Sequence, residues 1–143
     1  MTYLLDTCVL SEYKKLTPNP KVVDWLESQS DDLLFLSVLT IGELEKGIVK
    51  MPVSKRKSDL EAFVQTLLVR FDRRILGLDT ATLRRWGTIS GLLEAQGRPI
   101  PVIDSLMAAT ALEHELTIVT RNEEDFTPAG VKVLNLWHQT RKA

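Results

Sequence analysis

The sequence contains one cysteine and no long apolar run among its 143 residues. A single thiol, Cys8, cannot form an internal disulfide, which is typical of proteins in a reducing compartment. No basic and then apolar leader precedes the first hydrophobic run, and no stretch is long enough to cross a bilayer. We therefore expect a cytoplasmic protein with no membrane partner.

The chain also lacks an excess of charge of one sign, because 18 Lys and Arg residues nearly balance 19 Asp and Glu residues, for a formal net charge of −1. Such a chain has no overall attraction for a polyanion, so any contact with nucleic acid must come from local basic side chains or from metal ions. The length and the hydrophobic content of 44% are those of one compact domain with one core. Residues 1–143 are therefore predicted to form a single domain.

Several motifs for phosphate chemistry are missing as well. The chain has neither the G-x-G-x-x-G turn of dinucleotide-binding proteins nor the G-x-x-x-x-G-K-[ST] loop of P-loop proteins. A phosphotransferase of the haloacid dehalogenase type needs a second Asp two residues after the first, and position 8 is Cys. Metal-free acid–base cleavage of RNA needs two convergent histidines, whereas the chain has His114 in an expected helix and His138 near its end.

Five short apolar runs alternate with longer segments of helical spacing. The runs are rich in Leu, Ile and Val without strict alternation, as in central strands covered on both faces, and they span 3–5, 33–38, 75–79, 116–120 and 131–136. Helices are predicted over 20–29, 39–51, 57–71, 80–97 and 102–115. This order predicts an α/β sandwich with a mostly parallel sheet, in which ligands bind at the carboxyl ends of the strands. The polar stretch 51–59 is predicted to be a loop between two helices.

Two acidic side chains follow the first two of these strands. Asp6 comes directly after the first apolar run. Glu43 lies in the first turns of the helix after the second run, and the small Gly47 lies one turn later on the same face. Because the carboxyl ends of parallel strands meet at one edge of a sheet, we expect the two carboxylates to lie close together.

Two later segments add further oxygen-bearing side chains to the same edge. Asp104 opens the helix that follows the prolines at 99 and 101, where the helix dipole favours an ionised carboxylate. The loop after the fourth run supplies Thr120, Asn122 and Asp125. Three or four acids and one amide are thus expected to converge from four separate segments.

Such a cluster is suited to a hard divalent cation. Mg²⁺ and Mn²⁺ take oxygen ligands, keep several waters and are commonly held by a few carboxylates together with a substrate phosphate. Without metal the carboxylates repel one another, so at least one of them should have a raised pKa. A cation bound there can stabilise charge on a phosphoryl transition state and lower the pKa of a water, which is metal-assisted hydrolysis of a phosphodiester.

Four segments resemble motifs of the PIN-domain ribonucleases, and within them of the VapC-type toxins of toxin–antitoxin pairs. They are LLDTCVLSE (4–12), TIGELEKG (40–47), PVIDSLMAATA (101–111) and IVTRNEEDF (118–126), in this order along nearly the whole chain. The resemblance implies a PIN-like three-layer sandwich around a five-stranded parallel sheet, dependence on Mg²⁺ or Mn²⁺, and endoribonuclease activity. It also implies a homodimer and inhibition by a small VapB-like antitoxin whose tail can enter the active site.

By the same resemblance, individual residues take individual roles. Asp6, Glu43 and Asp104 would carry the metal, and Asp125 and Asn122 would complete the acidic pocket or orient water and ligand. Supporting hydroxyls would come from Thr7 and Thr120.

Two residues depart from the family pattern. The family often has asparagine at the position of Cys8, and some relatives have aspartate at the position of Asn122. We do not expect Cys8 to be a nucleophile. With one charge fewer at position 122, the site would depend more on Asp125, and whether it holds one metal or two is open.

Simpler explanations exist for each residue taken singly. Asp6 alone would be a helix cap, and Glu43 alone would pair with Lys46 or Lys50 on the helix surface. The apolar stripe from Leu60 to Phe71 is expected to be core or a subunit contact, and the three tryptophans are expected to be packing anchors.

Two open points concern what the acidic pocket acts on. Among the basic residues, Lys46 and Arg121 are candidates for RNA contact because they adjoin the acidic motifs. The alternative to an enzyme is a non-catalytic module that binds RNA or an antitoxin through the same pocket.

Overall fold

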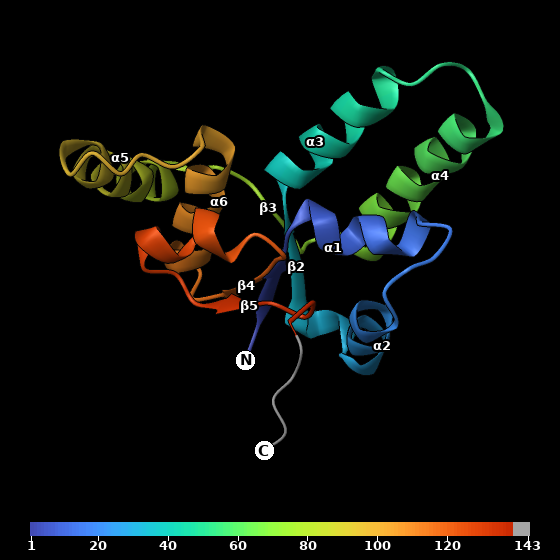
Figure 1. The fold of residues 1–143 in the computed structure, drawn as a ribbon, viewed down its shortest axis with the longest axis horizontal. Coiled ribbons are helices and arrows are strands. Elements are labelled where there is room, and N and C mark those ends of the chain that lie inside the picture. Colours follow the sequence, from blue (N-terminus) through green and yellow to red (C-terminus); the bar gives the residue numbers. More distant parts are fainter. Residues whose placement is uncertain (139–143) are drawn as a thin grey trace.

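A five-stranded sheet forms the middle of the protein (Figure 1). The computed structural model describes residues 1–138. The strands lie in the order β3-β2-β1-β4-β5, and every pairing is parallel; their bounds are Tyr3–Leu5 (β1), Leu34–Ser37 (β2), Ile75–Leu76 (β3), Thr117–Val119 (β4) and Val133–Leu134 (β5). The predicted mostly parallel sheet of five strands is confirmed, although each of the last four strands is shorter than its apolar run.

Successive residues of the central strands face opposite sides of the sheet, as a β pleat requires. Leu4 pairs with Ile118, and both belong to one apolar cluster. Leu5 pairs with Val119, and both belong to a second cluster. The sheet therefore separates two cores, and these four apolar side chains of β1 and β4 are fully buried.

The first core lies under helices α1 (Thr7–Ser11), α2 (Pro20–Ser28) and α4 (Lys55–Arg70). Each contributes buried apolar side chains to the cluster around Leu5 and Val119, namely Val9, Leu10, Val22, Leu26 and Leu67, and Phe71 joins them just after α4. Helix α3 (Val38–Val49) follows β2 and runs beside α4 (Figure 1). This side forms one outer layer of the sandwich.

The second core lies under α6 (Val102–Glu113), and α5 (Thr80–Ala95) packs against α6 (Figure 1). Three side chains of α6, Met107, Ala108 and Ala111, fill the space against Leu4 and Ile118. Short 3-10 helices lie between these elements, at Glu12–Lys14 (η1), Asp31–Leu33 (η2), Glu123–Asp125 (η3) and Thr127–Ala129 (η4). The predicted three-layer α/β sandwich is confirmed.

One predicted boundary is wrong. The stretch 51–59 was expected to be a loop, but α4 already begins at Lys55. Ser54 caps this helix, because its Oγ accepts a hydrogen bond from the backbone N–H of Lys57 at 3.1 Å. The loop is therefore only the first part of the polar stretch, and the three basic residues 55–57 form the first turn of the helix.

The apolar stripe on α4 belongs mostly to the core, as expected. Val64, Leu67 and Phe71 are buried, whereas Leu68 is 37% exposed. Two tryptophans are packing anchors: Trp25 meets Tyr3 edge to face at 4.8 Å between ring centroids, and the indole N–H of Trp86 on α5 donates to the Ser105 hydroxyl on α6 at 2.8 Å. Over residues 1–138, every helix falls short of the length and apolar content that crossing a membrane requires.

Candidate active site

Asp6 lies where β1 ends and α1 begins, and it is 7% exposed. Its backbone N–H continues the sheet by donating to the Val119 carbonyl at 3.0 Å. One carboxylate oxygen, Oδ1, accepts the Thr7 N–H at 2.8 Å and so caps α1, while Oδ2 accepts the Thr120 hydroxyl at 2.7 Å. One oxygen is thus oriented by the first residue of α1 and the other by the residue that follows β4, so Asp6 caps the helix and can also take part in the site.

Glu43 lies on the exposed side of α3, one turn before Gly47. Its Oε1 accepts the Thr7 hydroxyl at 2.7 Å, which ties α3 to the start of α1. Within the part of the chain that the structure describes, Glu43 has no ion pair with Lys46 or Lys50, so the simpler surface explanation fails. Thr7 therefore links Asp6 and Glu43 through its own backbone and side chain.

Asp104 lies in the first turn of α6 and is half-buried. Burial is the largest of several causes that together raise the pKa of its carboxyl from 3.8 to about 7. The others are the charge of Asp6, the charge of Asp125, a hydrogen bond to Asp125 and the charge of Glu43. The expectation that one acid of the cluster has a raised pKa is confirmed. The causes of the shift place Asp6, Glu43 and Asp125 within electrostatic reach of Asp104.

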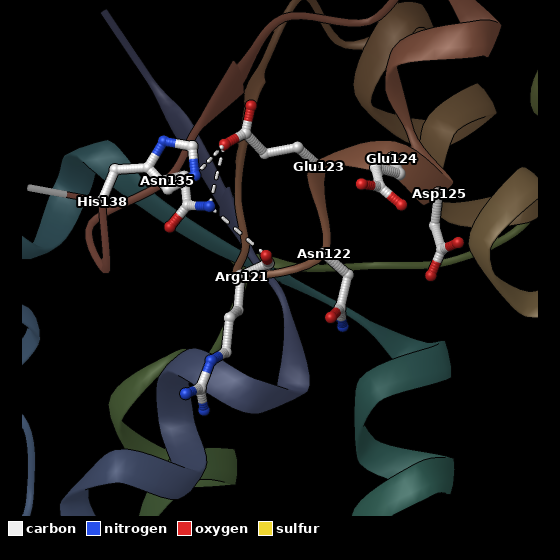
Figure 2. A pocket seen from close by; sticks show the side chains of 7 residues that line it. All are labelled: Arg121, Asn122, Glu123, Glu124, Asp125, Asn135 and His138. Carbon is white, nitrogen blue, oxygen red and sulfur yellow. Dashed lines mark hydrogen bonds and ion pairs between the residues drawn. The ribbon is translucent and has the colours of Figure 1, made fainter.

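The loop after β4 supplies the remaining polar groups. Thr120 is fully buried, and its hydroxyl accepts the Asn122 N–H at 3.0 Å while donating to Asp6. The Asp125 N–H then donates to the Asn122 carbonyl at 3.1 Å at the start of η3. Figure 2 shows Asn122 and Asp125 extending to one side of this loop, whereas Glu123 extends toward Asn135 and His138.

A hollow of about 420 Å³ adjoins this loop (Figure 2). It contains Asn122 and Asp125 among its lining residues but none of the other three acids. The acid cluster is therefore at the margin of this hollow, and we locate the candidate site by the contacts of Asp6 and Asp104.

Cys8 lies beside Asp6 and the loop that follows β4. Its Sγ is 3.7 Å from Asp6 Oδ2 and 3.8 Å from Thr120 Oγ1, and it accepts the Arg121 N–H at 3.4 Å. Burial and the charge of Asp6 raise the pKa of the thiol to about 11. Because a thiol with this pKa stays protonated near neutral pH, it is a poor nucleophile, as the sequence analysis expected.

The two basic candidates for substrate contact differ in their surroundings. Lys46 is exposed on α3. Arg121 extends its guanidinium away from Asn122 and Asp125 (Figure 2) and lies over the Trp137 ring at 5.6 Å from the centroid. Neither side chain has an ion pair with the four acids among the described residues.

Sequence reasoning missed the side chains that hold the loop after β4 in place. Asn135, just after β5, donates from Nδ2 to the Arg121 carbonyl at 3.3 Å and to Glu123 Oε2 at 2.9 Å. His138 Nε2 lies 3.0 Å from the same Glu123 oxygen. No motif signals these contacts, because they join two segments that each look like ordinary loop.

The donor set fits a hard divalent cation in chemistry. Over the described residues, no three Asp, Glu, His or Cys side chains already surround one point as a closed metal cluster. Mg²⁺ and Mn²⁺ do not need such a cluster, because one or two carboxylates, several waters and a substrate phosphate complete their octahedral shell. Asp104 is half-buried near other carboxyl groups, and a bound cation would relieve the repulsion among their charges.

A parallel α/β sheet with acidic side chains near its carboxyl edge defines the class, an α/β protein whose candidate site lies where such sheets bind ligands. Comparison with known proteins narrows this class. The family model of the PIN domain matches residues 3–130. The chain belongs to the PIN domain family.

The similar proteins cover nearly the whole chain. The sequence is 38% identical over 136 residues to toxin FitB of Neisseria gonorrhoeae, covering 94% of this chain and 98% of that protein. It is 37% identical over 135 residues to the plasmid stability protein StbB of Pseudomonas syringae pv. tomato, with 94% and 97% covered. The VapC ribonuclease Y4jK of Sinorhizobium fredii is 31% identical over 135 residues, with 94% and 96% covered.

Solved structures agree with these sequence relatives. The structure of FitAB bound to an IR36 DNA fragment superposes with a TM-score of 0.91 at 34% identity, covering 99% of this chain and 100% of that chain. The crystal structure of FitAcB from Neisseria gonorrhoeae gives a TM-score of 0.90 at 37% identity, with 96% and 100% covered.

Proposed function

We propose that the protein is a Mg²⁺-dependent endoribonuclease that acts as the toxin of a toxin–antitoxin pair. Membership of the PIN domain family and the relatives named ribonucleases support the enzyme class. The observation that carries the proposal is the meeting of acids from separate segments: Thr7 joins Asp6 and Glu43 by hydrogen bonds of 2.8 and 2.7 Å, and Asp104 is hydrogen-bonded to Asp125. Mn²⁺ is the alternative metal, since it accepts the same oxygen ligands.

In this proposal Asp6, Glu43 and Asp104 hold the metal. When bound, Mg²⁺ supplies charge neutralisation at the scissile phosphate and a lowered pKa for the attacking water. The attacking group is water and not the 2′-hydroxyl of the RNA, so the products carry a 5′-phosphate and a 3′-hydroxyl.

The chain's own groups orient the three carboxylates. Thr120 fixes Asp6 Oδ2, and Thr7 fixes Glu43 Oε1, each by a hydroxyl that donates at 2.7 Å. Asp125 is hydrogen-bonded to Asp104, so it holds a proton on that carboxyl while the metal is absent. Asn122 completes the pocket with an uncharged amide, and Asp125 is the acid of this loop that is hydrogen-bonded to Asp104.

A non-catalytic module that binds RNA or a peptide through the same pocket is the alternative. Mutual repulsion among carboxylates opposes their clustering unless a cation compensates it, and a binding module gains nothing from that repulsion. The raised pKa of Asp104 therefore favours catalysis.

The antitoxin part of the proposal is supported by the solved neighbours, which include FitAB and several VapBC complexes. An apolar hollow of about 280 Å³ lies between α1, α3 and α4, with Leu44, Ile48 and Phe63 in its wall and Glu43 at its border. Such a hollow suits the apolar side of a short antitoxin helix whose tail reaches the acids. We also propose that the whole chain is one domain, that it forms a homodimer and that it acts in the cytoplasm.

The decisive experiment incubates the purified protein with total RNA, in Mg²⁺ or in chelator, and maps the new ends. We expect cleavage only with metal, with 5′-phosphate and 3′-hydroxyl ends. Asp6→Asn and Asp104→Asn should each abolish it without unfolding the protein, whereas Glu45→Gln, an exposed acid on α3, should cleave normally. Cyclic phosphate ends, or full activity in Asp104→Asn, would contradict the mechanism; tight RNA or peptide binding without cleavage would favour the module.

A further inference from the structure

A further hollow, of about 470 Å³, lies between the start of α2 and the segment after β5. Its lining includes three cationic side chains, Lys15, Lys21 and Arg121, and one carboxylate, Glu12. The acid cluster nearby repels phosphate, and the net charge of the chain is only −1. A local excess of positive charge beside the site is therefore a feature that an RNA substrate would need.

Glu12 offsets the charge of Lys15, because its buried carboxylate forms an ion pair with that ammonium at 2.7 Å. Glu12 is 1% exposed, and it accepts the Lys15 ammonium at 2.7 Å, the Asn19 N–H at 2.8 Å and the indole N–H of Trp137 at 3.4 Å. Burial opposes ionisation, but the hydrogen bonds from Lys15 and Asn19 hold the pKa of Glu12 below its usual value. The Glu12 carboxylate is thus ionised, and it holds the groups that donate to it in place beside the hollow.

Glu12 helps to hold the Trp137 side chain in place. Besides its indole bond to Glu12, its backbone N–H donates to Asn135 Oδ1 at 2.9 Å. The ring presents a face to the Arg121 guanidinium at 5.6 Å, a distance at which a cation is attracted to an indole. Glu12 and Trp137 therefore fix the direction of Arg121.

Arg121 connects the hollow to the candidate active site. It lines both this hollow and the one beside Asn122 and Asp125. Its main chain is held at both ends, by the N–H bond to Cys8 Sγ and by the carbonyl bond from Asn135. Within the described residues its guanidinium has no carboxylate partner, so its donors remain open to a ligand.

We infer that this hollow binds the sugar–phosphate backbone of single-stranded RNA beside the scissile bond. Arg121 donates to a backbone phosphate, and the Glu12–Trp137 support keeps its planar fork in position before the substrate arrives. The inference rests on the proposed function, because it places the substrate of the same site.

The test measures binding of a short labelled RNA of mixed sequence by fluorescence anisotropy at several salt concentrations, in an Asp6→Asn background that prevents cleavage. Arg121→Ala should raise the Kd about tenfold, the loss expected for a charge-assisted hydrogen bond. It should also lower the slope of log Kd against log salt by about 0.7, the value for one phosphate contact on a single strand. Arg84→Ala, an exposed arginine of α5, is the matched control and should change neither.

Two further variants separate positioning from charge. Arg121→Lys keeps the charge but lacks the planar fork, so it should restore the salt slope while recovering only part of the affinity. Trp137→Phe keeps a ring under Arg121 but cannot donate to Glu12; it should raise the KM for RNA cleavage with little change in kcat, which a merely structural defect would not produce.

The outcomes distinguish this inference from the proposed function. If the Asp6→Asn protein binds RNA and the unsubstituted protein cleaves it, but Arg121→Ala leaves Kd and salt slope unchanged, the inference is wrong and the proposed function stands. The same holds if Arg121→Ala instead weakens capture of a purified antitoxin. If the unsubstituted protein neither binds nor cleaves RNA, the proposed function is wrong and this inference falls with it.

Discussion

Asp104 experiences two opposing influences. Its place in the first turn of α6 favours an ionised carboxyl, because the positive end of the helix dipole lies there. Burial and the charges of Asp6 and Asp125 oppose ionisation and prevail, since the pKa rises from 3.8 to about 7. The local expectation from the helix dipole was therefore outweighed by groups that come from distant parts of the chain.

This balance has a consequence for stability without metal. The folded-state pKa of Asp104 lies above the value of an exposed carboxyl, so the folded protein holds this proton more tightly than the unfolded chain. The contribution is fully present below about pH 4 and is lost as the pH rises through about 7. In chelator, Asp104→Asn should therefore be more stable than the unsubstituted protein at pH 8 by about 1 kcal/mol, after allowance for solvent screening of a half-exposed group.

Thermal unfolding at pH 8 and pH 5 measures this effect. The gap between the two proteins should narrow at pH 5 and should narrow again at pH 8 when Mg²⁺ is added, because the cation compensates the repulsion. Asp72→Asn, at an exposed aspartate, is the control and should show no such pH-dependent gap. A gap that is equal at both pH values would contradict the raised pKa.

Cys8 gives a second prediction at the residue scale. Because its thiol pKa is about 11, we expect iodoacetamide to modify the folded protein much more slowly at pH 8 than it modifies the unfolded chain. Cys8→Ser should keep most of the cleavage activity, since Ser Oγ also accepts the Arg121 N–H. Rapid alkylation, or complete loss of cleavage in a folded Cys8→Ser protein, would show that the thiol has a chemical role.

The residues that surround the acids show where sequence reasoning ends. Asp6, Glu43, Asp104 and Asp125 were predictable because each follows a strand or opens a helix at the same sheet edge. Glu12 was not, because its hydrogen bonds reach residues 19 and 137, and no local pattern indicates that pairing. Periodicity identifies which face of an element is apolar, but it says nothing about a buried carboxylate that pairs through tertiary contacts.

Among the elements, α5 and α6 are joined by two polar pairs, the exposed ion pair of Arg85 with Glu113 at 3.0 Å and the more buried pair of Trp86 with Ser105. The indole N–H of Trp86 donates to Ser105 Oγ, which itself donates to the Val102 carbonyl at 2.7 Å. Ser105→Ala should leave a half-buried indole N–H without its partner and destabilise the protein by about 1–3 kcal/mol, measured by urea denaturation. Thr88→Ala, an exposed hydroxyl on α5, should cost less than about 0.5 kcal/mol; equal losses would contradict a special role for this pair.

The helices were easier to predict than the strands. Residues 80–95 have apolar side chains at helical spacing, and Asp79 caps them with an Oδ1 that accepts the Thr82 N–H at 2.9 Å, so α5 begins where its sequence suggests. In contrast, β3 and β5 each contain two residues, because pairing with a neighbouring strand and not hydrophobicity decides where an edge strand ends. The early start of α4 was missed because a basic first turn looks like a loop.

For the whole molecule, the order of four acidic motifs predicted the family, and the alternation of apolar runs with helical segments predicted the mostly parallel sheet. Sequence alone does not tell which apolar side chains are exposed, because exposure depends on how the folded elements pack together. The α4 stripe was one candidate for a subunit contact, yet Val64 and Leu67 are buried in the core. The adjoining helices α5 and α6 each carry an exposed apolar side chain, Leu92 at 58% and Val102 at 61%, and other exposed apolar side chains, such as Val69 on α4 at 78%, lie elsewhere.

We therefore expect the predicted homodimer to use α5 and α6, the two helices that pack against each other on one side of the sheet. Sedimentation velocity should show a dimer at micromolar concentration, and Val102→Glu or Leu92→Glu should shift it toward monomer, because a charge buried in an apolar interface is costly. Val69→Glu on α4 is the matched control: this side chain is 78% exposed and lies outside the expected interface, so the dimer should persist. A monomer at every concentration would show that the homodimer is wrong, and dissociation by Val69→Glu alone would assign the interface to α4.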